Sequence, residues 1–336
     1  MSRLDAAVSD VMRLLDNVTM LTVADPGKNL IRQAPDTALL IIDVQQDFCP
    51  PPYPNGDPRN TGWGALAVGG GNDIVPLIND LRTHVQFGLV ILSQDFHSAD
   101  QASFASRYKA EYGWTPFTEV EFLYQRADKT CSPPKIIETK KKQFLWPDHC
   151  INGTDGAKFH SQLIQEESDV VVRKGMNPNV DSYSAFFDNL QSQKTALDDI
   201  LQARKIKKIV VVGLAFDYCV GSTAIDGSDK YESVVCEDAC RSVDPAHGRA
   251  GMLERLHDKK VKVMTCSQYT ESVPLAYAQP LPPQPKPRPT LTPLPKERLV
   301  SVNGIPIGQC TRAFTEEDFK DMGQIPVGEW PEPKKP

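Results

Sequence analysis

Six short runs of apolar residues recur along the middle of the chain, and stretches with a helical hydrophobic period separate them. A continuous apolar run, rather than an alternating one, is typical of a strand that is buried on both faces of a sheet. The runs cover residues 38–44, 89–95, 169–175, 208–215, 233–238 and 261–267. Strands that alternate with helices in this way indicate a mostly parallel sheet. We therefore predict an α/β fold, a three-layer αβα sandwich around a mostly parallel sheet of about six strands.

Apolar residues at helical spacing lie between these runs and predict the helices that cover the sheet. They fall into groups at 74–81, 159–164, 197–201 and 252–256. In a parallel sheet the ligand crevice lies beyond the carboxyl ends of the strands. Polar or reactive residues stand at the ends of four predicted strands, namely Asp43, Asp95, Lys174 and, after a short turn, Cys219. We expect these four residues to open onto one edge of the sheet.

The segments on either side of the predicted sheet differ from it in kind. Residues 1–36 have the pattern of an N-terminal helical extension, and the sheet domain is predicted to span 37–274. Residues 275–336 form a proline-rich C-terminal tail, and proline favours polyproline II over helix or central strand. We expect a semi-rigid spacer or a surface strap, with a protein partner of the SH3 or WW kind as the alternative. The flanks could also stabilise a homo-oligomer.

Composition and charge narrow the classes of partner. The chain has 336 residues and a formal net charge of −6, so we expect no basic surface for nucleic acid. No apolar stretch is long enough for a membrane span, and the start of the chain lacks the apolar core of a signal peptide. The eight cysteines include no Cys-x-x-Cys pair and fit a reducing compartment. We expect a cytoplasmic protein; a nuclear or peroxisomal address stays open.

Cys219 stands at the end of a buried strand, where small residues could begin a helix. Such a thiol is either core packing or a nucleophile whose anion is favoured by backbone N–H groups. Asp43 could accept its proton, and Lys174 could stabilise the resulting anions. Taken singly, each of the three has an ordinary structural role. Their joint placement favours the nucleophile, and we expect Lys174 to make Cys219 ionise more readily than the other cysteines.

A second cluster has the character of a metal site. Asp95 and His97 are two residues apart, so on an extended segment both side chains point to the same side. The third candidate is His149, in a loop after LWP, and His160 competes with it from an apparent helix. A carboxylate with two imidazoles suits Zn²⁺, Fe²⁺ or Mn²⁺. From spacing alone these residues leave both the metal site and the identity of the metal open.

Six segments resemble, in order, the nicotinamidases of the isochorismatase-like cysteine hydrolase superfamily. They are LLIIDVQQDF (39–48), GALAVGGG (64–71), SQDFHSADQASF (93–104), LWPDHC (145–150), RKG followed by SYSAF (173–186) and GLAFDYCVGSTAID (213–226). The combination of LWPDHC with the segment around Cys219 is the most specific part. It favours nicotinamidases over the other branches of the superfamily.

The resemblance implies a catalytic triad of Asp43, Lys174 and Cys219. It also implies a cis peptide before Ala215, and an oxyanion hole formed by the N–H groups of Ala215 and Cys219. The implied metal ligands are Asp95, His97 and His149, for one divalent ion that we expect to be Zn²⁺, with Fe²⁺ or Mn²⁺ as alternatives. The implied substrate-binding residues are Phe48, Trp146 and Tyr183. The implied reaction converts nicotinamide and water to nicotinate and ammonia through a cysteine thioester, as a step of NAD salvage.

Two other functions stay open. The chain could be another amidase of the superfamily that acts on a different carboxamide, or an inert scaffold whose working part is the proline-rich tail.

Segments 49–63 and 97–149 are longer than in a typical member and would border the pocket. Asp47 and Asp217 lie near the site in sequence, and we expect both to accept hydrogen bonds from loop amides rather than to act as bases.

Overall fold

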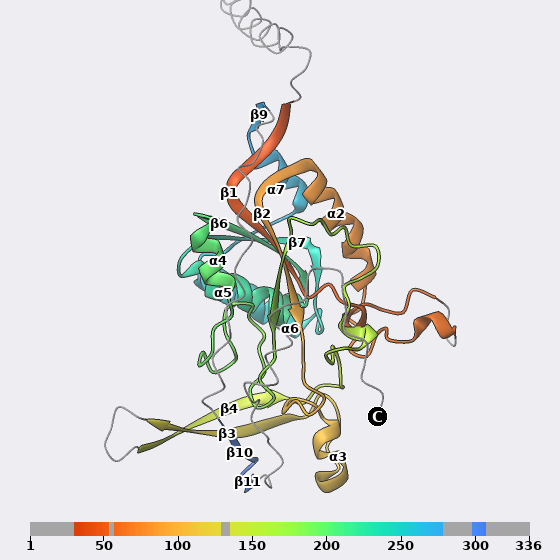
Figure 1. The fold of residues 1–336 in the computed structure, drawn as a ribbon, viewed down its shortest axis with the longest axis vertical. Helices are drawn as coiled ribbons and strands as arrows, with labels where there is room; N and C mark the ends of the chain where they lie inside the picture. Colours follow the sequence, from red (N-terminus) through yellow and green to blue (C-terminus); the bar gives the residue numbers. More distant parts are fainter. Residues whose placement is uncertain (1–29, 54–56, 129–134, 278–297, 307–336) are drawn as a thin grey trace, which may run out of the picture.

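In the computed structural model a parallel sheet forms the centre of the molecule, and a second, antiparallel sheet lies beyond one end of it (Figure 1). The structure describes residues 30–53, 57–128, 135–277 and 298–306. The central strands run in the order β5-β2-β1-β6-β7-β8, and all neighbours in this order are parallel. They are β1 (Leu30–Ile42), β2 (Val85–Asp95), β5 (Val170–Lys174), β6 (Lys208–Leu214), β7 (Glu232–Arg241) and β8 (Lys262–Met264). Each predicted apolar run is a strand, so the α/β prediction is confirmed.

Alternate side chains of the central strands pack into separate cores on the two faces of the sheet. Leu39 and Ile41 of β1 belong to the core under α2 and α7, and Leu40 and Ile42 belong to the core under α4, α5 and α6. All four are at most 1 % exposed. The helices are α2 (Ile74–His84), α4 (Leu197–Ala203), α5 (Gly221–Ser228), α6 (His247–Asp258) and α7 (Cys266–Ser272). Burial on both faces explains the continuous apolar runs and confirms the three layers.

One predicted helix is wrong. The stretch 159–164 is a turn and not a helix, and only the short 3-10 helix η4 (Asp155–Ala157) precedes it. The backbone here pairs with the end of β1 instead, because Phe159 forms a bridge with Gln45 and the His160 N–H donates to the Val44 carbonyl at 2.8 Å. Long-range pairing therefore overrides the helical spacing of the apolar residues.

The second sheet was not predicted. It has the strand order β11-β10-β3-β4, built from β3 (Glu119–Asp128), β4 (Lys135–Phe144), β10 (Arg298–Val302) and β11 (Ile305–Pro306). Val120, Phe122 and Tyr124 of β3 are buried against α3 (Ser106–Tyr112) and the chain before it. The sequence of β4 carries no matching signal, because most of its residues are exposed and polar. Figure 1 shows this sheet on the side to which the carboxyl ends of the central strands point.

Ordered strands extend past both predicted limits of the domain at 37 and 274. Residues 30–32 of β1 pair antiparallel with β9 (Leu275–Tyr277), which adds a seventh strand to the central sheet. β10 pairs antiparallel with β3, although it lies within the predicted tail. The expected N-terminal helix and the proline-rich run lie outside the described residues, so those predictions stand as made.

The remaining elements are short. They are the 3-10 helices η1 (Gln46–Phe48), η2 (Pro58–Asn60) and η3 (Gly71–Asp73), and the π-helix η5 (Phe216–Val220). Within the described ranges, no helix has both the length and the apolar character that crossing a bilayer requires.

Replacement of Leu299 tests whether β10 belongs to the folded core. Leu299 is 2 % exposed and packs in the same core as Phe122 and Tyr124. We expect Leu299→Ala to lower the free energy of unfolding of the full chain by about 2–5 kcal/mol, measured by urea denaturation. Leu275→Ala is the matched control, because Leu275 is 57 % exposed, and it should change stability by less than about 0.5 kcal/mol. Equal effects of the two substitutions would contradict a packed β10.

Candidate active site

Four side chains from neighbouring strand ends meet at the carboxyl edge of the central sheet. Lys174 is the last residue of β5, Asp95 is the last residue of β2, Asp43 follows β1, and Cys219 lies in η5 after β6. The strand order β5-β2-β1-β6 places them in that same sequence across the sheet. All four are at most 6 % exposed. The prediction that they share one edge is confirmed.

The Lys174 ammonium group joins the other three. Its Nζ atom lies 2.9 Å from Asp43 Oδ2, 2.7 Å from Asp95 Oδ1 and 3.4 Å from Cys219 Sγ, and it donates to the Ser182 carbonyl at 2.8 Å. Burial alone would lower the pKa of Lys174, but the two carboxylates raise it well above its usual value. The amine therefore stays charged.

Asp43 has the properties of a base near neutral pH. Burial raises the pKa of its carboxyl group to about 6, against the opposing effect of Lys174. Ser93 donates its hydroxyl hydrogen to Asp43 Oδ1 at 2.6 Å, which favours the ionised form. Asp43 also holds a left-handed backbone conformation, with φ of 48°, and its N–H donates to Ser93 Oγ at 3.1 Å. The position of this carboxylate is thus fixed by its neighbours.

Cys219 remains a neutral thiol in the resting site. Burial raises its pKa well above the usual thiol value, and Lys174 opposes this only in part. Lys174 thus favours ionisation of Cys219 as expected, but burial has the larger effect; readier ionisation of Cys219 than of the other cysteines stays a prediction. The Cys219 sulfur lies within 4.8 Å of a carboxylate oxygen of Asp43, so a proton acceptor stands close by. The peptide bond between Leu214 and Ala215 is cis, in agreement with the family resemblance.

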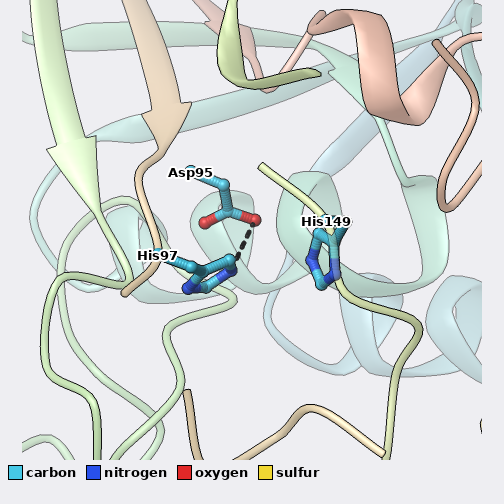
Figure 2. Close-up of side chains that lie close together, drawn as sticks. All are labelled: Asp95, His97 and His149. Atoms are coloured by element: carbon cyan, nitrogen blue, oxygen red, sulfur yellow. Dashed lines mark ion pairs between the residues drawn. The ribbon is translucent and has the colours of Figure 1, made fainter. Parts of the chain in front are cut away.

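Asp95, His97 and His149 form a buried group that could hold a metal ion (Figure 2). One ligand atom from each lies within 4.8 Å of the others, and His97 Nε2 is 3.5 Å from Asp95 Oδ2. His97 Nδ1 donates to the Gly175 carbonyl at 2.9 Å, and His149 Nδ1 donates to the Pro147 carbonyl at 2.7 Å. Because carbonyls only accept, each Nδ1 carries a hydrogen, and in the neutral ring Nε2 is then the atom with the lone pair for a metal.

The chemistry of this group fits a divalent cation. His97 Nε2 is buried without a hydrogen-bond partner among the described residues. Burial and the neighbouring His97 lower the pKa of His149 to about 4, so its imidazole is neutral, as a metal ligand must be. Gly175 allows the close packing here, because a Cβ atom at this position would lie 2.4 Å from His97 Cε1. A carboxylate with two imidazoles suits Zn²⁺, Fe²⁺ or Mn²⁺.

Gln45 fixes the backbone around Asp95. Its Nε2 group donates to the carbonyls of Asp95 and Ala157, each at 2.9 Å, and its Oε1 accepts from the Asp95 N–H at 2.8 Å. Gln45 is fully buried. The β2 end is therefore held in place by an amide side chain from the residue two positions after Asp43.

Aromatic rings stand on two sides of the four-residue centre. The Phe48 ring lies 5.2 Å from the His149 ring, next to the metal group. Trp146 and Tyr183 lie together, with the Trp146 Nε1 group donating to the Tyr183 hydroxyl oxygen at 3.3 Å. Tyr218, beside Cys219, packs its ring 5.0 Å from Trp146 and 5.3 Å from Tyr183. The three predicted substrate-binding residues thus flank the site.

The two acidic residues set apart in the sequence analysis have structural contacts. Asp47 Oδ2 accepts from the Cys150 N–H at 2.7 Å, and Asp217 accepts from the N–H groups of Val243 and Asp244 at 2.9 and 2.8 Å. Both carboxylates fix loops, in agreement with the prediction.

Sequence reasoning missed Ser93, Gln45 and Tyr218. Two of them had a usable signal, because Ser93 lies two residues before Asp95 and Gln45 two residues after Asp43. A period of two directs such side chains to the same face of an extended segment. Tyr218 had none, since its direction depends on the π-helix around Cys219.

A buried thiol, lysine and carboxylate beside an Asp-His-His group, on a three-layer α/β fold, define the class. The chain belongs to the isochorismatase domain family, whose model matches residues 37–268.

Several of the similar proteins are nicotinamidases. The nicotinamidase of Escherichia coli is 39 % identical over 213 residues, covering 62 % of this chain and 85 % of the relative. The nicotinamidase of Schizosaccharomyces pombe is 29 % identical over 230 residues, covering 68 % and 92 %. Among solved structures, a nicotinamidase and pyrazinamidase of Acinetobacter baumannii superposes with a TM-score of 0.57 at 30 % identity, covering 70 % of this chain and 98 % of that one.

Metal binding should depend on His149 and not on His160. His149→Ala removes one ligand, and we expect the affinity for Zn²⁺ to fall by at least about 10- to 100-fold, measured by competition with a chromophoric chelator. His160→Ala is the matched control, because His160 is also buried but lies outside the metal group. Equal affinities in the two variants would count against the assignment.

Proposed function

We propose that this protein hydrolyses nicotinamide to nicotinate and ammonia. The observation that carries the proposal is the Lys174 ammonium group, which contacts Asp43, Asp95 and Cys219 at the carboxyl edge of the sheet. This single cation contacts the thiol nucleophile, its base and the aspartate of the Asp-His-His group. The similarity to nicotinamidases of bacteria and yeast supports the choice of substrate.

The first step is attack by Cys219. Asp43 accepts the thiol proton, and the thiolate bonds to the carboxamide carbon while the C=O electron pair moves onto oxygen. The adjacent Lys174 charge stabilises the thiolate during this transfer. The N–H groups of Ala215 and Cys219 donate to the negatively charged oxygen of the tetrahedral intermediate.

Two further steps complete the reaction. The C–N bond breaks, the leaving nitrogen takes the proton back from Asp43, and ammonia departs from a thioester at Cys219. Water then loses a proton to Asp43 and attacks the thioester carbon. The C–S bond breaks, the thiolate regains its proton from Asp43, and nicotinic acid leaves and loses its carboxyl proton to the solvent as nicotinate. One water is consumed for each amide bond, and the protein returns to its starting state.

Asp95, His97 and His149 are the residues that would hold a divalent metal, for which we propose Zn²⁺. Such an ion supplies a Lewis-acid contact for the pyridine nitrogen and so orients the substrate. Phe48, Trp146 and Tyr183 would line the ring. We further propose a role in NAD salvage in the cytoplasm. Self-association and a protein partner of the proline-rich tail stay predictions from the sequence.

Ammonia release tests the nucleophile and the substrate together. We expect purified wild-type protein loaded with Zn²⁺ to release ammonia from nicotinamide, and Cys219→Ala to lose at least about 10⁴-fold in kcat, because no other described thiol contacts Lys174. Cys266→Ala is the matched control: Cys266 is similarly buried, lies outside the site and should leave the rate unchanged. A wild-type protein without nicotinamide turnover, but active on another carboxamide, would transfer the proposal to a different amidase.

The rate should depend on the ionisation of Asp43. The carboxylate is the active base and its pKa is raised to about 6, so kcat/KM should rise with pH through about 6 and be lost below it. Ser93→Ala removes a hydrogen bond to the ionised form, and this limb should therefore move to higher pH. The profile is measured by ammonia release from pH 4.5 to 8. A limb at the same pH in both proteins would argue against Asp43 as the base.

A further inference from the structure

The Gln143 side chain connects the second sheet to the aromatic side of the active site. Gln143 is the next-to-last residue of β4 and is 4 % exposed. Its Nε2 group donates to the Tyr183 hydroxyl oxygen at 2.8 Å and to the Phe144 carbonyl at 2.8 Å. Its Oε1 atom accepts from Asn189 Nδ2 at 3.3 Å. Each polar atom of this buried amide therefore has a partner, and one partner is a residue of the site.

Tyr183 is held at its hydroxyl group by Gln143 and at its backbone by Asn189, which itself bonds to Gln143. Its phenol oxygen accepts from Gln143 and from Trp146 Nε1, while its backbone N–H donates to Asn189 Oδ1 at 3.0 Å. Asn189 in turn donates to Gln143, which closes a ring of hydrogen bonds. A tyrosine fixed at its backbone and at its hydroxyl has little freedom to rotate away from the rings that it packs against.

The remainder of β4 indicates that this contact is specific. Over the whole of this strand, from Lys135 to Phe144, Gln143 is the only buried residue. The neighbouring charged residues make exposed cross-strand pairs instead, as Lys140 does with Glu121 and Lys142 with Glu119. An amide that is buried in a strand whose other residues are exposed or half-buried is held there by its partners.

We propose that Gln143 is a positioning residue that sets the affinity for the substrate by fixing the Tyr183 ring. The inference rests on the proposed function and extends it to the second sheet. Gln143 has no hydrogen bond to Asp43, Lys174 or Cys219, so it acts on binding and leaves the chemical step unchanged. The β3–β4 hairpin thereby contributes to substrate recognition.

The test measures KM and kcat for nicotinamide in the full-length, metal-loaded protein. Loss of one buried hydrogen bond to Tyr183 should raise KM about 5- to 10-fold in Gln143→Leu, with kcat within about two-fold of wild type. Tyr183→Phe removes the same bond from the other side, together with the bond from Trp146, and should raise KM at least as much. The double variant should raise KM no further than Tyr183→Phe alone, because the bond between Gln143 and Tyr183 is already absent in that single variant. Gln125→Leu is the matched control on β3, because the Gln125 side chain donates to the exposed Glu138 and has no hydrogen bond to a site residue among the described residues, and its KM should equal that of wild type.

Each other outcome contradicts either the positioning role of Gln143 or the proposed function. Unchanged KM in Gln143→Leu, additive increases in the double variant, or a fall in kcat alone would overturn the positioning role while the proposed function stands. If Gln143→Leu does not fold, as judged by its thermal unfolding, Tyr183→Phe decides: an unchanged KM there overturns the inference. A wild-type protein without nicotinamide turnover overturns the proposed function and this inference with it.

Discussion

The arrangement of the site depends on one buried ammonium group. Burial of an ammonium group away from water is strongly unfavourable unless negative charges balance it and its hydrogens have acceptors. Lys174 meets this condition with acceptors that come from separate parts of the fold, Asp95 from β2, Asp43 from β1 and the Ser182 carbonyl from the loop after β5. These partners converge only if three strands end at the same level of the sheet. The alignment of the strands in the sheet and the charged state of Lys174 therefore depend on each other.

The same contacts distribute protons between the groups. Lys174 keeps its charge, Asp43 has a pKa of about 6, and Cys219 holds its proton in the resting state. The lysine does not make the thiol acidic enough to ionise by itself, since burial has the larger effect. It favours the anion at the moment when Asp43 accepts the proton.

The sequence predicted the central sheet and the members of the site with good success, for a physical reason. Strands buried on both faces must be apolar throughout, and the carboxyl edge of a parallel sheet gathers whatever polar residues end those strands. The second sheet could not be predicted because it depends on pairing between strands that are far apart along the chain. β10 lies next to β3 in space but is separated from it by most of the sequence of the central sheet. Its one local signal was the alternation of Val120, Phe122 and Tyr124. The contact of Gln143 with Tyr183 follows from that pairing and could not be derived from spacing.

β10 also carries a consequence for the synthesis of the chain. Until residues 298–302 have left the ribosome, the β3–β4 hairpin presents an unpaired edge along Phe122 to Gln125, although the strands of the central sheet have already been made. An open strand edge is a template for pairing with other chains. The segment that follows the catalytic domain thus closes a surface that would otherwise invite aggregation. Shortening the chain at its proline-rich run would leave that surface open permanently.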